Sequence, residues 1–120
     1  MRPHEKLETW SLAMDFVIDT YRATDAFPKE EKFGLTSQIR RAAVSVPANI
    51  AEGAARNSEK EFIHFLSNAQ GSASELDTEL IIAHRLGYMT DEKFAELQVK
   101  LEKIGRLITG LSQYLKRRNQ

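Results

Sequence analysis

The apolar residues of this sequence recur at alternating intervals of three and four, and this spacing limits what the chain can fold into. The pattern runs from Phe62 to Ala83, from Phe94 to Leu115 and, in shorter form, from Leu35 to Ile50. Steps of three and four return to the same face of an α-helix, whereas a half-buried strand alternates with a period of two. Because no stretch shows the Val/Ile/Thr-rich alternation typical of strands, the sequence predicts an all-α fold.

Turn-forming residues divide the chain into four predicted helices. Breaks at Pro28, Asn57–Ser58 and Gly87–Thr90 give helices at about residues 7–25, 29–56, 58–87 and 90–117. Short connections force neighbouring helices to run antiparallel, so we expect one domain over residues 1–120, an up-down-up-down four-helix bundle. Pro47 lacks the N–H group that a helix needs and is expected to kink the second helix, whose first turn Gly34 can split off.

The sequence has more apolar residues than are needed for one narrow buried stripe, or seam, on each of the four predicted helices. The seam predicted for the first helix is Leu7, Trp10, Met14, Val17 and Tyr21. A helix of a small bundle buries a stripe about 100° wide, and the residues outside these stripes predict association between copies of the chain. A broad core within one copy is the other interpretation. The candidate interface residues are Leu12, Phe16, Phe65, Ile81 and Ile82.

A polar stripe follows the second helix at the same spacing. If it faces the third helix, Arg41 is expected to pair with Glu75 or Glu79, and Asn49 to satisfy the carbonyl that Pro47 leaves free. The alternative is that both stripes are the solvated sides of amphipathic helices. The candidate polar site comprises Gln38, Arg41, Asn49, Glu52 and Glu75.

Charge is balanced overall but unevenly distributed. The chain has 17 Lys and Arg against 17 Asp and Glu, which argues against a general polyanion binder, yet the fourth helix is basic and the third acidic. A terminal basic run is also typical of a solvated tail that complements the helix dipole, and the sequence shows no aromatic–basic interleaving. The candidate nucleic-acid contacts are Arg40, Arg56, Lys116, Arg117 and Arg118.

Residues that would mark a catalytic or metal site are few. The absence of Cys excludes thiol nucleophiles, disulfides and Cys-bound metals, and no Gly-rich phosphate loop, nucleophile elbow or H-E-x-x-H motif occurs. Glu61 and His64 have the Glu-x-x-His spacing of di-iron bundles, but such a site needs a second copy of the element, which the sequence lacks. We therefore expect no catalytic residue, no metal and no cofactor.

Long runs of the sequence resemble one protein family. They are Phe27–Glu31, Gly34–Gly53 (GLTSQIRRAAVSVPANIAEG), Phe62–Leu66, Ala69–Ser72 and Leu86–Tyr88. In these runs the sequence is similar to the four-helix bundle proteins encoded in intervening sequences of bacterial 23S ribosomal RNA genes. Trp10 and Ala13 fit the first helix of the same pattern, so the resemblance extends over nearly the whole chain. The resemblance implies the same fold.

The resemblance also implies how the chain assembles. Family members look like homopentamers packed as a barrel around a central channel, and their activity is unassigned. They are similar in architecture to the accessory variability proteins of diversity-generating retroelements, basic pentamers that bind a reverse transcriptase and nucleic acid. This chain differs from those relatives in its neutral charge. The resemblance implies a homo-oligomer in which Arg41, Asn49 and Glu52 form a shared polar site, as a buried network or lining the channel.

These expectations describe a non-enzymatic, oligomeric helical scaffold in the cytoplasm. It would engage RNA, or a ribonucleoprotein or reverse-transcriptase partner. No membrane is expected, because no segment is long and apolar enough to span a bilayer. No small-molecule substrate is expected either. The competing hypothesis is a structural or protein-binding module without a nucleic-acid role. Clustering of Arg40, Arg56 and Arg117 on one rim of the assembled oligomer would favour the scaffold that binds RNA.

Overall fold

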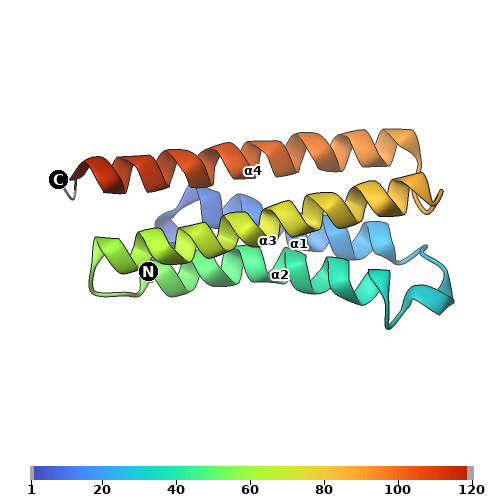
Figure 1. Ribbon diagram of the computed structural model, residues 1–120, viewed down its shortest axis with the longest axis horizontal. Helices are drawn as coiled ribbons and strands as arrows, with labels where there is room; N and C mark the ends of the chain where they lie inside the picture. Colours follow the sequence, from blue (N-terminus) through green and yellow to red (C-terminus); the bar gives the residue numbers. More distant parts are fainter. Residues whose placement is uncertain (1, 119–120) are drawn as a thin grey trace.

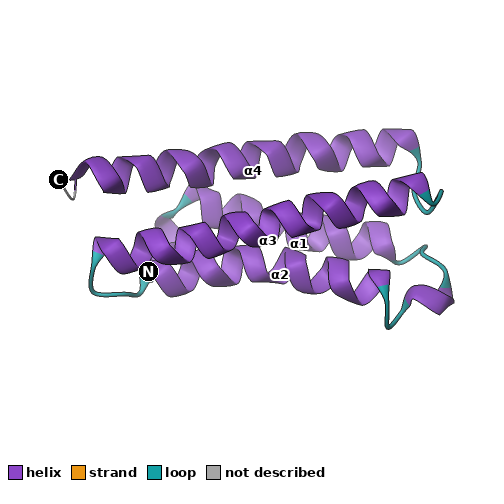
Figure 2. Cartoon of the chain, in the orientation of Figure 1, coloured by secondary structure: helices purple, strands orange, loops and turns teal. Residues whose placement is uncertain are grey.

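Four long helices make up most of the structure, a computed structural model that describes residues 2–118. They are α1 (Glu8–Thr24), α2 (Leu35–Ala54), α3 (Glu59–Arg85) and α4 (Asp91–Arg118), with short 3-10 turns η1 (Pro3–Lys6) and η2 (Lys29–Glu31) before α1 and α2. No strand occurs between residues 2 and 118 (Figure 2). Successive helices run in opposite directions, and α1 packs on both α2 and α4 (Figure 1). The prediction of an all-α four-helix bundle is confirmed.

The limits of α3 and α4 follow from local hydrogen bonding. The Ser58 hydroxyl accepts the backbone N–H of Glu61 at 3.1 Å, and the Thr90 hydroxyl does the same for Lys93 at 3.1 Å, so both residues are N-caps. Gly87, with a φ of 81°, ends α3 in the left-handed conformation that glycine adopts without steric cost. The predicted limits of these two helices lie within two residues of the observed ones.

The second predicted helix is interrupted near its start. Gly34 separates η2 from α2, so the stretch predicted at 29–56 is two elements. Beyond Gly34, α2 is continuous through Pro47, and the kink there stays a prediction. Near its other end, α2 comes very close to α3, since a Cβ atom added at Gly53 would lie 2.8 Å from the Cβ of Phe65.

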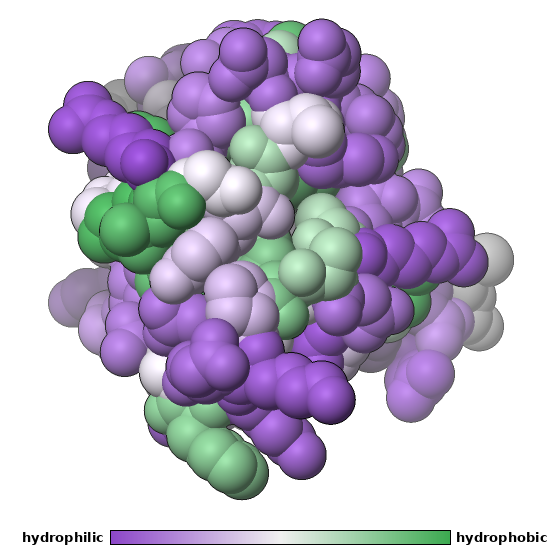
Figure 3. Space-filling view, turned by 90° about the vertical axis from the view of Figure 1, so that its right-hand side faces the viewer, coloured by the Kyte–Doolittle hydropathy of each residue, from purple (hydrophilic) through white to green (hydrophobic). Residues whose placement is uncertain are grey.

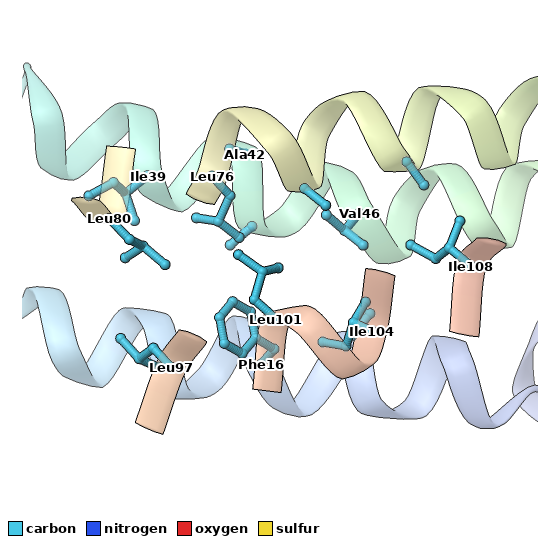
Figure 4. Packing of buried hydrophobic residues seen from close by; sticks show 14 of the residues in the cluster. Phe16, Ile39, Ala42, Val46, Leu76, Leu80, Leu97, Leu101, Ile104 and Ile108 are labelled. Carbon is cyan, nitrogen blue, oxygen red and sulfur yellow. The ribbon is translucent and has the colours of Figure 1, made fainter. Parts of the chain in front are cut away.

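Aliphatic side chains of α2, α3 and α4 fill the centre of the bundle (Figure 4). Their positions repeat the predicted spacing of three and four on each of these helices, so these three seams are confirmed. The largest fully buried residues are Ile39 and Ile50 on α2, Leu66, Leu76 and Leu80 on α3, and Leu97 and Ile108 on α4.

The seam predicted for the first helix is only partly right: Leu7, Trp10 and Val17 are half-buried and pack against the core, but the other two residues do not. Met14 and Tyr21 of that seam are each 40% exposed, and Ile18 between them is 49% exposed. The buried hydroxyls of α1 carry no cost, because Thr20 and Thr24 donate to the carbonyls of Phe16 and Thr20 at 2.7 and 2.9 Å. The helix is turned by one residue, about 100°, relative to the prediction. Its buried residues are Thr9, Ala13, Phe16, Thr20 and Thr24.

The same rotation overturns one of the predicted interface residues. Phe16 is 3% exposed and points into the core towards Leu101 (Figure 4), so it is not available to a second copy. Leu12, Phe65 and Ile81 are half-buried, and Ile82 is exposed. Large apolar side chains stay exposed at several places within residues 2–118, and on α1 they follow one face at Met14, Ile18 and Tyr21, which we call the α1 stripe. None of the described helices is both long and apolar enough to cross a membrane.

Candidate functional site

A wide hollow runs over the N-terminal half of α2, where α1 and α3 flank it. It has a volume of about 830 Å³, within the range of ligand-binding pockets. We call it the α2 groove. It lies towards the end of the bundle formed by the α1–α2 connection, where apolar surface is set among hydrophilic side chains (Figure 3). Its principal lining residues are Tyr21, Lys32, Phe33, Arg41, Val44 and Glu75.

Phe33 stands at one wall of the groove with almost its whole side chain in solvent. It is 89% exposed, and the Nζ atom of Lys32 lies 5.4 Å from the centre of its ring. The connection that carries both residues is fixed by Glu31, which accepts the N–H of Leu35 at 3.2 Å and the hydroxyl of Tyr88 at 2.9 Å. The hydrogen bond to Glu31 also raises the pKa of Tyr88. Phe33 is therefore exposed although the segment that carries it is held in place by hydrogen bonds.

The neighbouring arginines Arg40 and Arg41 have different surroundings. Arg40 donates to the Thr24 hydroxyl at 2.9 Å, the Tyr21 carbonyl at 3.2 Å and the Asp25 carboxylate at 3.1 Å. It thereby satisfies a free carbonyl at the C-terminus of α1 and complements the helix dipole. Arg41 is exposed and donates to the Ser37 hydroxyl at 3.0 Å. Of the two, Arg41 offers the guanidinium to the groove.

The predicted polar site is only partly assembled. Ser45 and Ser72 share a hydrogen bond of 2.8 Å that joins α2 to α3, and the Asn49 amide donates to the Ser45 carbonyl and hydroxyl at 2.9 and 3.0 Å. The prediction that Asn49 satisfies the carbonyl freed by Pro47 is wrong, because its amide is used on Ser45.

The other members of the polar site have separate roles. The predicted pairing of Arg41 with Glu75 or Glu79 is wrong, since neither pair is within 4.0 Å among the ion pairs of residues 2–118. Glu52 pairs at 2.6 Å with Arg56, in the turn that follows α2, and Gln38 is exposed. For these two residues the interpretation as the solvated side of a helix fits better.

A buried carboxyl group lies one turn from the groove on α3. Glu79 is 6% exposed, and its Oε1 atom has no hydrogen-bond partner within residues 2–118. Burial, together with the neighbouring charge and hydrogen bond of Glu75, raises the pKa of Glu79 to about 7. The Thr36 hydroxyl is likewise buried without a partner in the described chain, at the floor of the groove.

The basic residues predicted to contact nucleic acid do not gather on one rim of the protomer. Arg56 and the run 116–118 lie at the end that holds the α2–α3 turn and the C-terminus of α4 (Figure 1). Arg40 lies near the start of α2, 14 residues before its last residue, Ala54, which puts it about 21 Å along the helix axis from that end. Arg118 is paired with Glu59 at 3.2 Å, which ties the end of α4 to the start of α3.

The structure adds groove residues that the sequence pattern did not single out. Tyr21 comes from α1, whereas Lys32 and Phe33 come from the connection before α2, so the proximity of Tyr21 to the other two has no local signature. The Lys–Phe pair immediately before the helix break at Gly34 is the one signal that could have drawn attention to them. Within residues 2–118, no three His, Asp, Glu or Cys side chains come close enough together to hold a metal ion.

Comparison with known proteins gives the family of this bundle. The family model described as 23S rRNA-intervening sequence protein matches residues 5–110. The chain belongs to this family. Among solved structures, the chain is similar to a protein from Bacteroides thetaiotaomicron that is described as a protein with unknown function from the S23 ribosomal protein family.

The likeness to that structure extends over nearly the whole bundle. The TM-score is 0.78 at 23% sequence identity, and the alignment covers 87% of this chain and 97% of the other. At this identity the comparison supports the fold of the intervening-sequence protein and carries no activity across. No curated protein matches the chain.

Proposed function

We propose that this intervening-sequence protein is a non-catalytic, cytoplasmic helical scaffold that assembles with copies of itself and engages RNA or a ribonucleoprotein partner. The observation that carries the proposal is the α1 stripe, because its three large apolar side chains remain 40 to 49% exposed after the protomer has closed. Val44 on α2, 43% exposed, lines the α2 groove together with Tyr21 of the stripe. Contiguous apolar surface of this kind marks interaction sites on soluble proteins.

The assembly can be tested by light scattering at protein concentrations from about 1 to 100 μM. We expect a mass several times the 13.7 kDa of one chain, and five times that mass if the pentamer implied by the resemblance forms. Ile18→Glu places a charge in the α1 stripe and should shift the mass towards the monomer. Val99→Glu is the matched control, because Val99 is also exposed but lies on α4. A monomeric wild type over the whole range contradicts the scaffold proposal.

The nucleic-acid part of the proposal is supported by exposed cations at two places. They are Lys32 and Arg41 at the groove, and Arg56 with the run 116–118 at the opposite end of the bundle. Such contacts are independent of base sequence and weaken steeply with salt. Retention of 23S ribosomal RNA fragments should be measured at about 50 and 200 mM salt. No retention at the lower salt contradicts RNA binding and leaves the assembly untouched.

A structural or protein-binding module without a nucleic-acid role is the second candidate. It is favoured by the use of several predicted phosphate contacts within the protomer: Arg40 with Asp25, Arg56 with Glu52, and Arg118 with Glu59. An assembled protein that retains no RNA at low salt would support this candidate.

A further inference from the structure

The α2 groove brings together aromatic and cationic side chains that are separated in the sequence. Tyr21 comes from α1, Lys32 and Phe33 from the connection before α2, and Arg41 from α2 itself. Single-stranded nucleic acid is commonly bound in this way, with bases stacked on aromatic rings and phosphates held by nearby cations. The alternation that the linear sequence lacks is therefore created by the fold.

We propose that the α2 groove binds single-stranded RNA, with an unpaired base stacked on the ring of Phe33 and adjacent phosphates held by Lys32 and Arg41. The inference rests on the nucleic-acid part of the proposed function and assigns it to a site. Phe33 is 89% exposed, so its ring face is open to a base. Lys32 and Arg41 form no ion pair within residues 2–118, so their charges are free for phosphates.

The charges of the groove favour a polyanion over a peptide. Lys32, Arg40 and Arg41 line it, against one carboxylate, Glu75. Because Arg40 is paired with Asp25, Lys32 and Arg41 provide the positive charge that remains. The chain as a whole is neutral, so this positive surface is a local feature and not a consequence of composition. An unpaired strand fits better than a duplex, because the bases of a duplex are already stacked on one another and cannot reach the ring of Phe33.

The opposite end of the bundle provides a matched comparison. There, the guanidinium of Arg118 lies 5.5 Å from the ring of Tyr114, as Lys32 lies 5.4 Å from the ring of Phe33. Tyr114 is 48% exposed, but Arg118 is paired with Glu59. Both ends thus have a cation beside an exposed aromatic ring, and only the pair at the groove has an uncommitted cation.

The first experiment measures binding of a fluorescently labelled, unstructured RNA of about 12 nucleotides by anisotropy at low salt. Stacking of a base contributes about 1 to 3 kcal/mol, so Phe33→Ala should weaken binding about 5- to 150-fold. Tyr114→Ala should leave the affinity within about twofold. Phe33→Trp should retain the affinity, and its indole fluorescence should be quenched when RNA binds, a signature that a merely structural role would not produce.

The second experiment measures the salt dependence for Lys32→Gln and Arg41→Gln. Each lost phosphate contact on a single strand lowers the slope of log K against log salt by about 0.7, so each variant should show a shallower slope than wild type. Lys60→Gln is the control, because Lys60 is an exposed cation at the start of α3, away from the groove. It should keep the wild-type slope.

Several outcomes would overturn the assignment. If Tyr114→Ala weakens binding and Phe33→Ala does not, RNA is bound at the C-terminal end, and the proposed function stands without this site. Equal affinity for a duplex of the same length excludes stacking on Phe33. If the wild type binds no RNA at all, the nucleic-acid part of the proposed function fails as well. If Phe33→Ala changes the assembled mass and not RNA binding, the ring serves an interface between copies.

Discussion

At Gly53 the backbones of α2 and α3 come so close that a side chain does not fit between them. A Cβ atom there would lie 2.8 Å from the Cβ of Phe65 and 2.9 Å from a ring carbon of Phe62. Neither contact is with the flexible end of a long side chain, so relief requires the helices to separate. The glycine is therefore explained by tertiary packing, although glycine is unfavourable inside a helix.

Gly53→Ala should lower the free energy of unfolding by about 1 to 3 kcal/mol, because overpacking forces a shift of the two helices. Gly71→Ala is the matched control within α3: nothing lies within 4 Å of its added Cβ, so better helix propensity should stabilise the protein by about 0.5 to 1 kcal/mol. Urea denaturation of both variants checks the opposite signs. A stabilised Gly53→Ala protein would contradict the close approach.

Glu79 should make the stability of the fold depend on pH. Its pKa of about 7 in the folded chain exceeds the value of about 4.3 for an unfolded chain. Between these values the folded state binds more protons, so the free energy of unfolding should fall as pH rises, by at most about 1.4 kcal/mol per pH unit. Below about pH 4 the contribution is fully present, and above about pH 7 it is lost.

Glu79→Gln should remove this contribution to the pH dependence, since a neutral amide occupies the same space at every pH. Urea denaturation at pH 5 and pH 8 should show a smaller difference for this variant than for wild type. Glu102→Gln, an exposed position on α4, serves as the control and should keep the wild-type difference. Unchanged pH dependence in Glu79→Gln would show that other groups cause it.

At the scale of the elements, the joint between α1 and α2 depends on Arg40. Its guanidinium holds the last turn of α1 through Thr24, Tyr21 and Asp25 and lies 4.5 Å from the centre of the Tyr21 ring. Arg41, one residue further along, contacts Ser37 on its own helix. Because the two side chains are the same, replacing each in turn distinguishes the structural role of Arg40 from the binding role proposed for Arg41.

Arg40→Met should destabilise the protein by about 1 to 2 kcal/mol and speed hydrogen exchange in the last turn of α1, since that turn loses its cap. Arg41→Met should change stability by less than about 0.5 kcal/mol, as expected for an exposed side chain. Exchange followed by mass spectrometry distinguishes the two. If exchange in α1 is equal in both variants, Arg40 does not cap the helix.

The helices themselves were predictable where large aliphatic residues mark the buried face. On α2, α3 and α4 the Leu and Ile residues occupy the seam, and burial of those side chains is the main favourable term in packing. On α1, Met14, Ile18 and Tyr21 are exposed, whereas Phe16, Ala13 and three Thr residues face inwards. Small residues allow two helices to pack closely. A prediction based on the spacing of large apolar residues does not identify a buried face of this kind.

At the scale of the whole molecule, the exposed apolar surface should link stability to protein concentration. If copies cover the α1 stripe, only the folded chain can bind its neighbours, and mass action raises the melting temperature as concentration increases. We expect Tm to rise between about 5 and 500 μM in wild type, and this rise to disappear in Ile18→Glu. A Tm independent of concentration in both would indicate that the stripe stays exposed to solvent.

The sequence by itself determined the class of fold, the limits of α3 and α4, and the buried faces of α2, α3 and α4, because periodicity, caps and glycine stops act within a few residues along the chain. Tertiary structure alone decided the rotation of α1, the burial of Phe16 and Glu79, the use of Arg40 as a cap, and the meeting of Tyr21, Lys32, Phe33 and Arg41 in one groove. These features depend on distances between segments far apart in the chain, which are set when the helices pack.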